Sequence, residues 1–166
     1  MSLFLSMLGG PRCIHLCGNP DWDFLLRPDS DPLSLDARNN RDILAAYHEN
    51  IRSYLASGKA IAWGAVPTHT VVLERQSPHG LARKLVGLWE EVAGDGLTLA
   101  DIAGRSLITP ATCCLVNPDL TTTVEKAFEL TSEVSSLLGE AAAMNVQLPW
   151  SPQGSKRRRR EIAYGD

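Results

Sequence analysis

Residues 60–66 read AIAWGAV, a short apolar run that is followed directly by Pro67 and preceded by Gly58. A run of this length and composition between residues that interrupt regular structure predicts a β-strand. Three more runs of this kind occur along the chain, at residues 12–17 (RCIHLC), 32–36 (PLSLD) and 106–113 (SLITPATC). We therefore expect four strands, spread over most of the chain.

Helical patterns separate the strands. Between the second and third strands, apolar side chains recur every three or four residues, at Ile43, Tyr47, Ile51 and Tyr54. We expect one helix here, capped by Asn39-Asn40 and ended by Gly58. Further apolar faces predict helices at residues 81–92 and 122–144, with a short helical turn at 98–103 that Thr98 and Asp101 cap. Strands that alternate with helices predict an α/β fold with about four parallel strands.

Length and composition indicate one domain with a tail. The chain has 166 residues, with 44% hydrophobic and 21% charged residues, which is ordinary for a globular domain. We expect residues 1–148 to form the domain, and residues 149–166, rich in Pro, Gly, Ser and Arg, to be a disordered basic tail. The basic residues gather in KRRRR at 156–160 instead of spreading over a folded face, which argues against nucleic-acid binding.

The compartment follows from the amino terminus and the thiols. Residues 2–8 read SLFLSML, a run that no Lys or Arg precedes and that is too short to span a bilayer. The four cysteines belong to a chain large enough to build a core without disulfides. We expect reduced thiols, a cytoplasmic protein and no membrane partner.

Donor groups for a metal ion stand at the ends of the predicted strands. Side chains two apart share a face of a strand, so Cys13, His15 and Cys17 point the same way. Asp36 ends the second strand and Cys113 the fourth, at the edge where parallel sheets carry functional groups. Histidine, cysteine and carboxylate are the usual zinc ligands. The pattern predicts a zinc site of His15, Cys17 and Cys113 with Asp36 as a candidate fourth ligand; the alternative is chance spacing of cysteines that pack in a core.

These stretches resemble the barrel superfamily that contains cobalamin-independent methionine synthase, the zinc-dependent corrinoid:thiol methyltransferases and uroporphyrinogen decarboxylase. The resembling residues are CIHLCGN at 13–19, DSDPLSLDA at 29–37, IAWGAVPT at 61–68 and RSLITPATCCL at 105–115. Their order and spacing are similar to the last four strands of that eight-stranded barrel. The resemblance covers about residues 10–145 and implies half of a TIM-type β/α barrel with flanking helices.

The resemblance also implies roles for the donor residues. His15 and Cys17 match the first two zinc ligands of the methionine synthases, Asp36 falls where that family often has a glutamate ligand, and Cys113 takes the last thiolate position. The final loop is one residue longer than the family pattern, and Cys114 stands where glycine is expected. Cys114 is therefore an alternative to Cys113.

The function implied by the resemblance is zinc-dependent methyl transfer in methionine biosynthesis. A substrate thiol such as homocysteine would bind zinc as a thiolate and take a methyl group from a folate or corrinoid donor. The Asp-Glu-Pro type motif of the family's first half is missing from this sequence. We therefore expect a half-barrel fragment that is incomplete alone and pairs with a second copy or with a complementing amino-terminal half.

Two other functions stay open at this point. The first is a non-catalytic barrel remnant or a subunit of a split enzyme, in which the same residues merely pack. The second is an enzyme similar to uroporphyrinogen decarboxylase, which would need clustered arginines for an anionic tetrapyrrole. The candidates for that role, Arg12, Arg27 and Arg105, are scattered along the chain.

Overall fold

A computed structural model describes residues 7, 12–18, 20–26, 31–94, 96–114, 117–119 and 121–143. The predicted basic tail at 149–166 and the arginine candidate Arg27 lie outside the described residues. No helix in the described part of the chain is long and apolar enough to cross a membrane.

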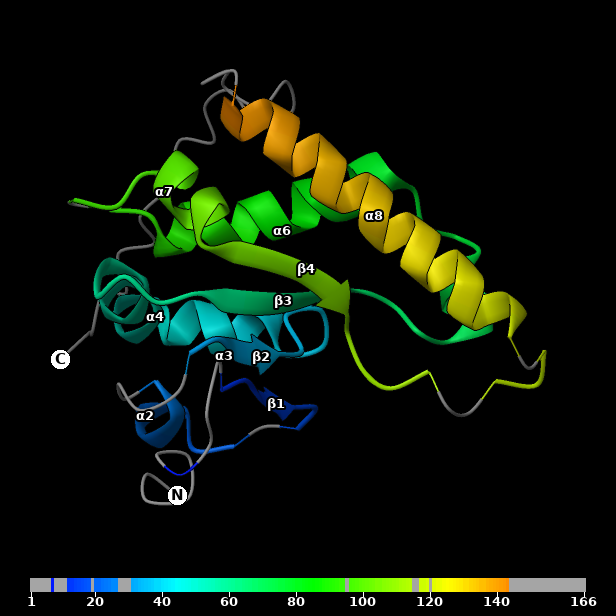
Figure 1. Cartoon of the computed structure of the whole chain (residues 1–166), viewed down its shortest axis with the longest axis horizontal. Helices are drawn as coiled ribbons and strands as arrows, with labels where there is room; N and C mark the ends of the chain where they lie inside the picture. The colour runs from blue at the N-terminus through cyan, green and yellow to red at the C-terminus, as the bar shows by residue number, and fades with distance from the viewer. Residues whose placement is uncertain are drawn as a thin grey trace, which may run out of the picture.

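Four parallel strands form one sheet, in the order in which they occur along the chain. They are β1 (Ile14–Leu16), β2 (Leu33–Leu35), β3 (Ile61–Val66) and β4 (Ser106–Pro110). Their arrows run in one direction in Figure 1, with β1 and β4 at the two edges. This confirms the predicted α/β fold with four parallel strands. A sheet in which each strand lies beside its predecessor is compatible with part of a β/α barrel wall, whereas doubly wound sheets reverse their strand order in the middle.

The fourth strand is shorter than predicted. We expected it to continue to Cys113, but β4 ends at Pro110. Its partner β3 ends at Val66, because Pro67 follows and has no backbone N–H for a strand ladder. The last backbone hydrogen bond between β3 and the chain that follows β4 is donated by Ala111 N to Val66 O, at 2.7 Å. Cys113 therefore lies in a loop and not at a strand end.

Helices connect the strands and cover one face of the sheet. They are α2 (Trp22–Leu25), α3 (Arg41–Ala46), α4 (His48–Ala56), α5 (Thr70–Leu73), α6 (Pro78–Val92), α7 (Leu99–Gly104) and α8 (Thr122–Ala143). The helix from residue 78 to residue 92, the turn capped by Thr98 and Asp101 and the long last helix confirm the sequence pattern. The short helices α2 and α5 were not predicted, because one turn is too short to show a periodic pattern.

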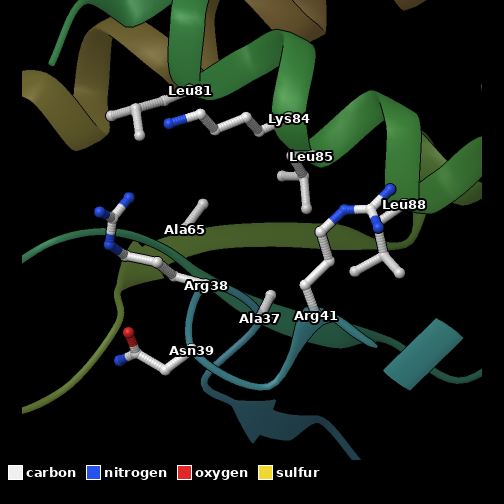
Figure 2. Close-up of a pocket in the computed structure, with 9 residues that line it drawn as sticks. All are labelled: Ala37, Arg38, Asn39, Arg41, Ala65, Leu81, Lys84, Leu85 and Leu88. Carbon is white, nitrogen blue, oxygen red and sulfur yellow. The ribbon is translucent and has the colours of Figure 1, made fainter. Parts of the chain in front are cut away.

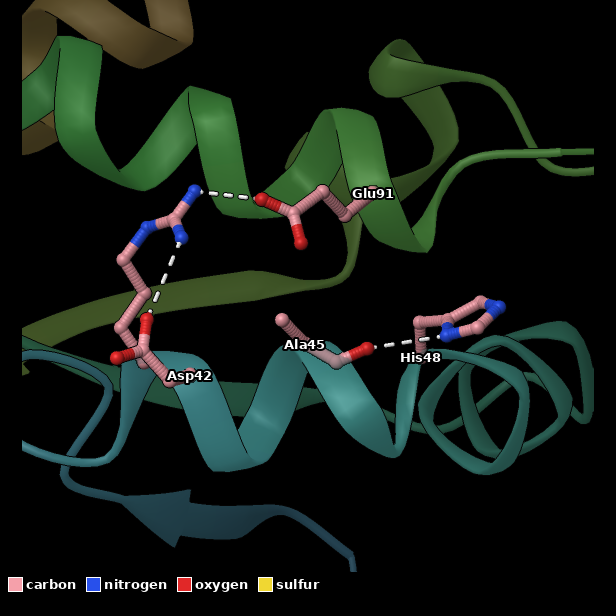
Figure 3. A network of polar contacts seen from close by, with 5 residues as sticks. Asp42, Ala45, His48 and Glu91 are labelled. Atoms are coloured by element: carbon pink, nitrogen blue, oxygen red, sulfur yellow. Dashed lines mark hydrogen bonds and ion pairs between the residues drawn. The ribbon is translucent and has the colours of Figure 1, made fainter. Parts of the chain in front are cut away.

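The prediction of a single helix between the second and third strands was wrong. The structure has two helices there, α3 and α4, which are separated at Tyr47. At this break, Nδ1 of His48 donates to the carbonyl oxygen of Ala45 at 3.0 Å. Figure 3 marks this hydrogen bond. Gly58 follows α4 with φ +89°, so the predicted glycine end of this segment is confirmed.

The two faces of the sheet have different neighbours. On β3, Trp63 lies against Trp89 of α6 with ring centroids 6.1 Å apart, so this face of the sheet packs on the helices. Leu35 is the register partner of Trp63 and shares that face. Ser34 and its partner Ala62 alternate to the opposite face, and His15, the partner of Ser34 on β1, lies there too. The buried core is thus on the helix side, and the predicted metal ligand His15 is on the open side.

Gly64 is needed where the register of β3 and β4 shifts, between Gly64 and Val66. A Cβ atom on Gly64 would come within 2.8 Å of both Ala111 Cα and Leu35 O. Both are backbone atoms, so neither can move away as a side chain would. We expect Gly64→Ala to lower the free energy of unfolding by about 1–3 kcal/mol, measured by urea titration.

Gly139→Ala is the matched control for this change, because nothing lies within 4 Å of a Cβ added to this exposed glycine of α8. It should leave stability unchanged or raise it by about 0.5–1 kcal/mol. Equal effects of the two substitutions would contradict the close approach of Ala111 to β3.

Candidate metal centre

The side chain of His15 is held between two polar neighbours at the edge of the sheet. Its Nδ1 lies 2.8 Å from Ser34 Oγ, and its Nε2 lies 2.9 Å from Cys17 Sγ. Ser34 is almost fully buried, with 6% of its surface exposed, while His15 and Cys17 are exposed. The predicted pairing of His15 with Cys17 on one face of the first strand is therefore confirmed, and the ring has a fixed orientation.

Ser34 was missed by the sequence analysis. A metal-binding histidine commonly uses one ring nitrogen for the metal and the other for a hydrogen bond that orients the ring. Here Ser34 occupies Nδ1, which leaves Nε2 beside the sulfur of Cys17. Nε2 and Sγ are both zinc-binding atoms. The arrangement therefore offers two donor atoms side by side, facing away from the helices.

Asp36 has a different set of partners. It is 1% exposed, and both carboxylate oxygens accept hydrogen bonds from Asn39: Oδ1 from the backbone N at 2.9 Å and Oδ2 from Nδ2 at 2.6 Å. The adjacent Asn40 donates through Nδ2 to the carbonyls of Asp36 at 3.1 Å and of Gly18 at 3.5 Å. Asp36 thus organises the turn at residues 36–40, and Asn40 ties that turn to the loop after β1.

The expected capping by the asparagine pair was only partly right. Asn40 is the residue directly before α3, but its side chain makes no capping bond to the helix; its Nδ2 donates to the carbonyls of Asp36 and Gly18. The two N–H donors of one amide can thus serve carbonyls of two different loops.

Cys113 and Cys114 lie in the loop after β4, which is attached to the end of β3. Thr112 Oγ1 lies 2.7 Å from Thr68 Oγ1, and Asn117 Nδ2 donates to Thr68 O at 2.9 Å and to Cys114 O at 3.3 Å. Cys113 is exposed and Cys114 is partly buried. Burial, and then the neighbouring Cys113, raise the pKa of the Cys114 thiol, which disfavours its thiolate. Of the two, Cys113 is the better candidate ligand.

Cys13 precedes the pair on β1 and belongs to the same face. Burial raises the pKa of its thiol as well. A thiol that resists ionisation is a poorer metal ligand, because the metal binds the thiolate. Cys13 is exposed and is not among the predicted ligands.

The structure brings together two of the four predicted donors. Over the residues that it describes, no three side chains of His, Cys, Asp or Glu are close enough to share a metal ion. His15 and Cys17 are in contact, whereas the carboxylate of Asp36 is bound to Asn39 and the thiols of Cys113 and Cys114 are held on the β4 loop.

Two of the three arginines considered for a tetrapyrrole site are described, and neither is at this edge. Arg12 precedes β1 and Arg105 precedes β4, so both stand at the amino ends of parallel strands, opposite the donors. Arg105 also donates through Nη1 to the carbonyl of Leu55.

Comparisons of the chain with family models, with curated proteins and with solved structures found no match.

Proposed function

We propose that this chain is a zinc-dependent methyltransferase domain of the methionine-synthase type, which transfers a methyl group to a thiol such as homocysteine. The observation that carries the proposal is the contact of His15 Nε2 with Cys17 Sγ at 2.9 Å, with Nδ1 held by Ser34. Both donors stand at the carboxyl end of an edge strand, and the four strands follow one another in the sheet as in a β/α barrel.

His15, Cys17 and Cys113 are the proposed zinc ligands, with Cys114 as the substitute for Cys113 and Asp36 as the candidate fourth. The His15–Cys17 pair fits a zinc ion in donor type and proximity. Cys113 is exposed on its loop and has to approach the pair. Asp36 can reach a metal only by exchanging its two hydrogen bonds to Asn39.

In the proposed reaction, the sulfur of the substrate attacks the methyl carbon of a folate or corrinoid donor. A sulfur–carbon bond forms as the bond from the methyl group to its carrier breaks, and the electrons of that bond stay with the carrier. A folate carrier also takes up a proton from solvent on the nitrogen that loses the methyl group. The thiol proton leaves to solvent before the attack. A zinc ion held by these residues would lower the pKa of the substrate thiol, so that its thiolate would form near neutral pH. Ser34 contributes by keeping the His15 ring in one orientation.

The sheet requires a further set of strands to form a closed barrel. In the described part of the chain, β1 pairs only with β2 and β4 only with β3, so both edges are open. Leu107 of β4 is 52% exposed and shares the open face with His15 through the register of the sheet. Open edges and an exposed leucine on an edge strand favour association. We propose that a second copy, or a complementing amino-terminal half-barrel, covers them.

Metal analysis tests the zinc centre. The purified chain should contain about one zinc ion, and Cys17→Ser and Cys113→Ser should lose it because each removes a thiolate ligand. Ser34→Ala should weaken zinc binding by about tenfold, since the ring of His15 loses its orienting partner. Metal content by mass spectrometry and competition with a chelating dye give these two quantities.

Cys13→Ser is the matched control, because it removes a thiol from the same strand face two residues before His15. It should keep its zinc. Zinc that survives both Cys17→Ser and Cys113→Ser would contradict the assignment, and loss in Cys114→Ser alone would move the ligand to that residue. The alternative, a non-catalytic remnant, requires no stoichiometric metal and thiols that react only on unfolding.

Sedimentation tests the association. A chain of 18.1 kDa that completes its barrel with a second copy should sediment as a dimer at micromolar concentration. Leu107→Glu should dissociate this dimer, because it places a charge on the face that the second copy covers. Phe128→Glu is the control, since Phe128 is exposed to a similar extent, 59%, but lies on α8. A stable folded monomer would contradict closure by a second copy.

A further inference from the structure

A pocket of about 240 Å³ lies on the helix side of the sheet, between the turn after β2 and helix α6. Figure 2 shows Ala37, Arg38 and Arg41 on the side of the turn, and Leu81, Lys84, Leu85 and Leu88 on the side of the helix. The side chain of Ala65, from β3, also lines it and points toward α6 in Figure 2. The pocket is therefore on the opposite face of the sheet from the donors His15 and Cys17.

The floor of the pocket is apolar. Five of the lining side chains are aliphatic and each is at most 7% exposed: Ala37, Ala65, Leu81, Leu85 and Leu88. An apolar cavity of roughly 150 Å³ holds one benzene molecule, so this pocket has room for a body of that size with a polar head.

The rim of the pocket is cationic. Arg38, Arg41 and Lys84 line it, and no carboxylate does. Arg41 is paired with a carboxylate, since its Nη2 is 2.6 Å from Glu91 Oε1. Arg38 and Lys84 form no ion pair with any residue that the structure describes; Lys84 Nζ donates only to the neutral amide of Gln76, at 3.4 Å. Two positive charges therefore face the pocket without an anionic partner.

Arg38 is held in place from two sides. Its backbone N donates to Gly64 O at 3.0 Å, and the turn that carries it is organised by the hydrogen bonds of the buried Asp36 to Asn39. In Figure 2 the guanidinium of Arg38 and the ammonium of Lys84 extend toward the same end of the pocket from the turn and from the helix. A fixed backbone lowers the entropy that is lost when the side chain binds a ligand.

We propose that this pocket binds a small phosphate monoester with a compact apolar body. The phosphate dianion would lie between Arg38 and Lys84, because its two charges match theirs and the guanidinium fork pairs with two phosphate oxygens. The apolar body would lie on the leucines of α6. This site is separate from the zinc centre and does not depend on it.

Calorimetric titration of the full chain with phenyl phosphate tests the proposal. Saturable binding is expected, weaker at higher ionic strength, and tighter than the binding of inorganic phosphate because the phenyl ring covers apolar surface. Arg38→Gln combined with Lys84→Gln should weaken binding by at least about tenfold. Arg83→Gln is the matched control: it removes the same charge from an exposed position beside Lys84 on α6 that does not line the pocket, and the affinity should change less than about twofold.

Three results would overturn the proposal: no saturable binding of phenyl phosphate, unchanged affinity in the double variant, or equal affinity for inorganic phosphate. Cys17→Ser, which is expected to lose zinc, should bind phenyl phosphate like the unaltered chain. Its result separates this site from the proposed methyltransferase function, because either one can fail while the other holds.

Discussion

The contact between His15 and Ser34 is the interaction on which the candidate centre depends. These residues are partners in the parallel pairing of β1 with β2, and Ser34 Oγ lies 2.8 Å from Nδ1 of the ring. Because Nδ1 is occupied, Nε2 is directed to Cys17 Sγ. A shift of the β1–β2 register by one residue would turn His15 to the helix face and separate it from both partners. The chemistry proposed for this protein is therefore a consequence of strand register.

That register is held by the core on the other face of the sheet. Leu33 and Leu35 of β2 are fully buried against the helices, and the same alternation that buries them turns Ser34 toward the open face. The turn at residues 36–40 connects the two sides. Its Asn40 reaches the carbonyl of Gly18 in the loop after β1, and Arg38 bonds to β3 and presents its side chain to the cationic pocket. One short turn thus supports the edge of the candidate metal centre and one wall of the pocket.

Much of this fold could be predicted from the sequence, because the apolar runs and helical periods are strong local signals. All four strands and the long helices α6 and α8 were expected where they occur. The end of β4 was not expected, since the neighbouring strand decides it: β3 stops before Pro67, and Val66, its last residue, accepts the final hydrogen bond of the pair from Ala111 N. The division at Tyr47 was missed because the apolar period continues across it. Of the site, the His15–Cys17 contact follows from strand alternation, whereas the roles of Ser34 and Asn39 depend on register and turn geometry, which local patterns do not contain.

X-ray absorption at the zinc edge of the zinc-loaded full chain tests the central claim most directly, because it reports which atoms bind the metal. The account predicts two sulfur atoms at about 2.3 Å and at least one nitrogen at about 2.0–2.1 Å, with one sulfur fewer in any zinc that Cys17→Ser retains. A shell of nitrogen and oxygen without sulfur would contradict it.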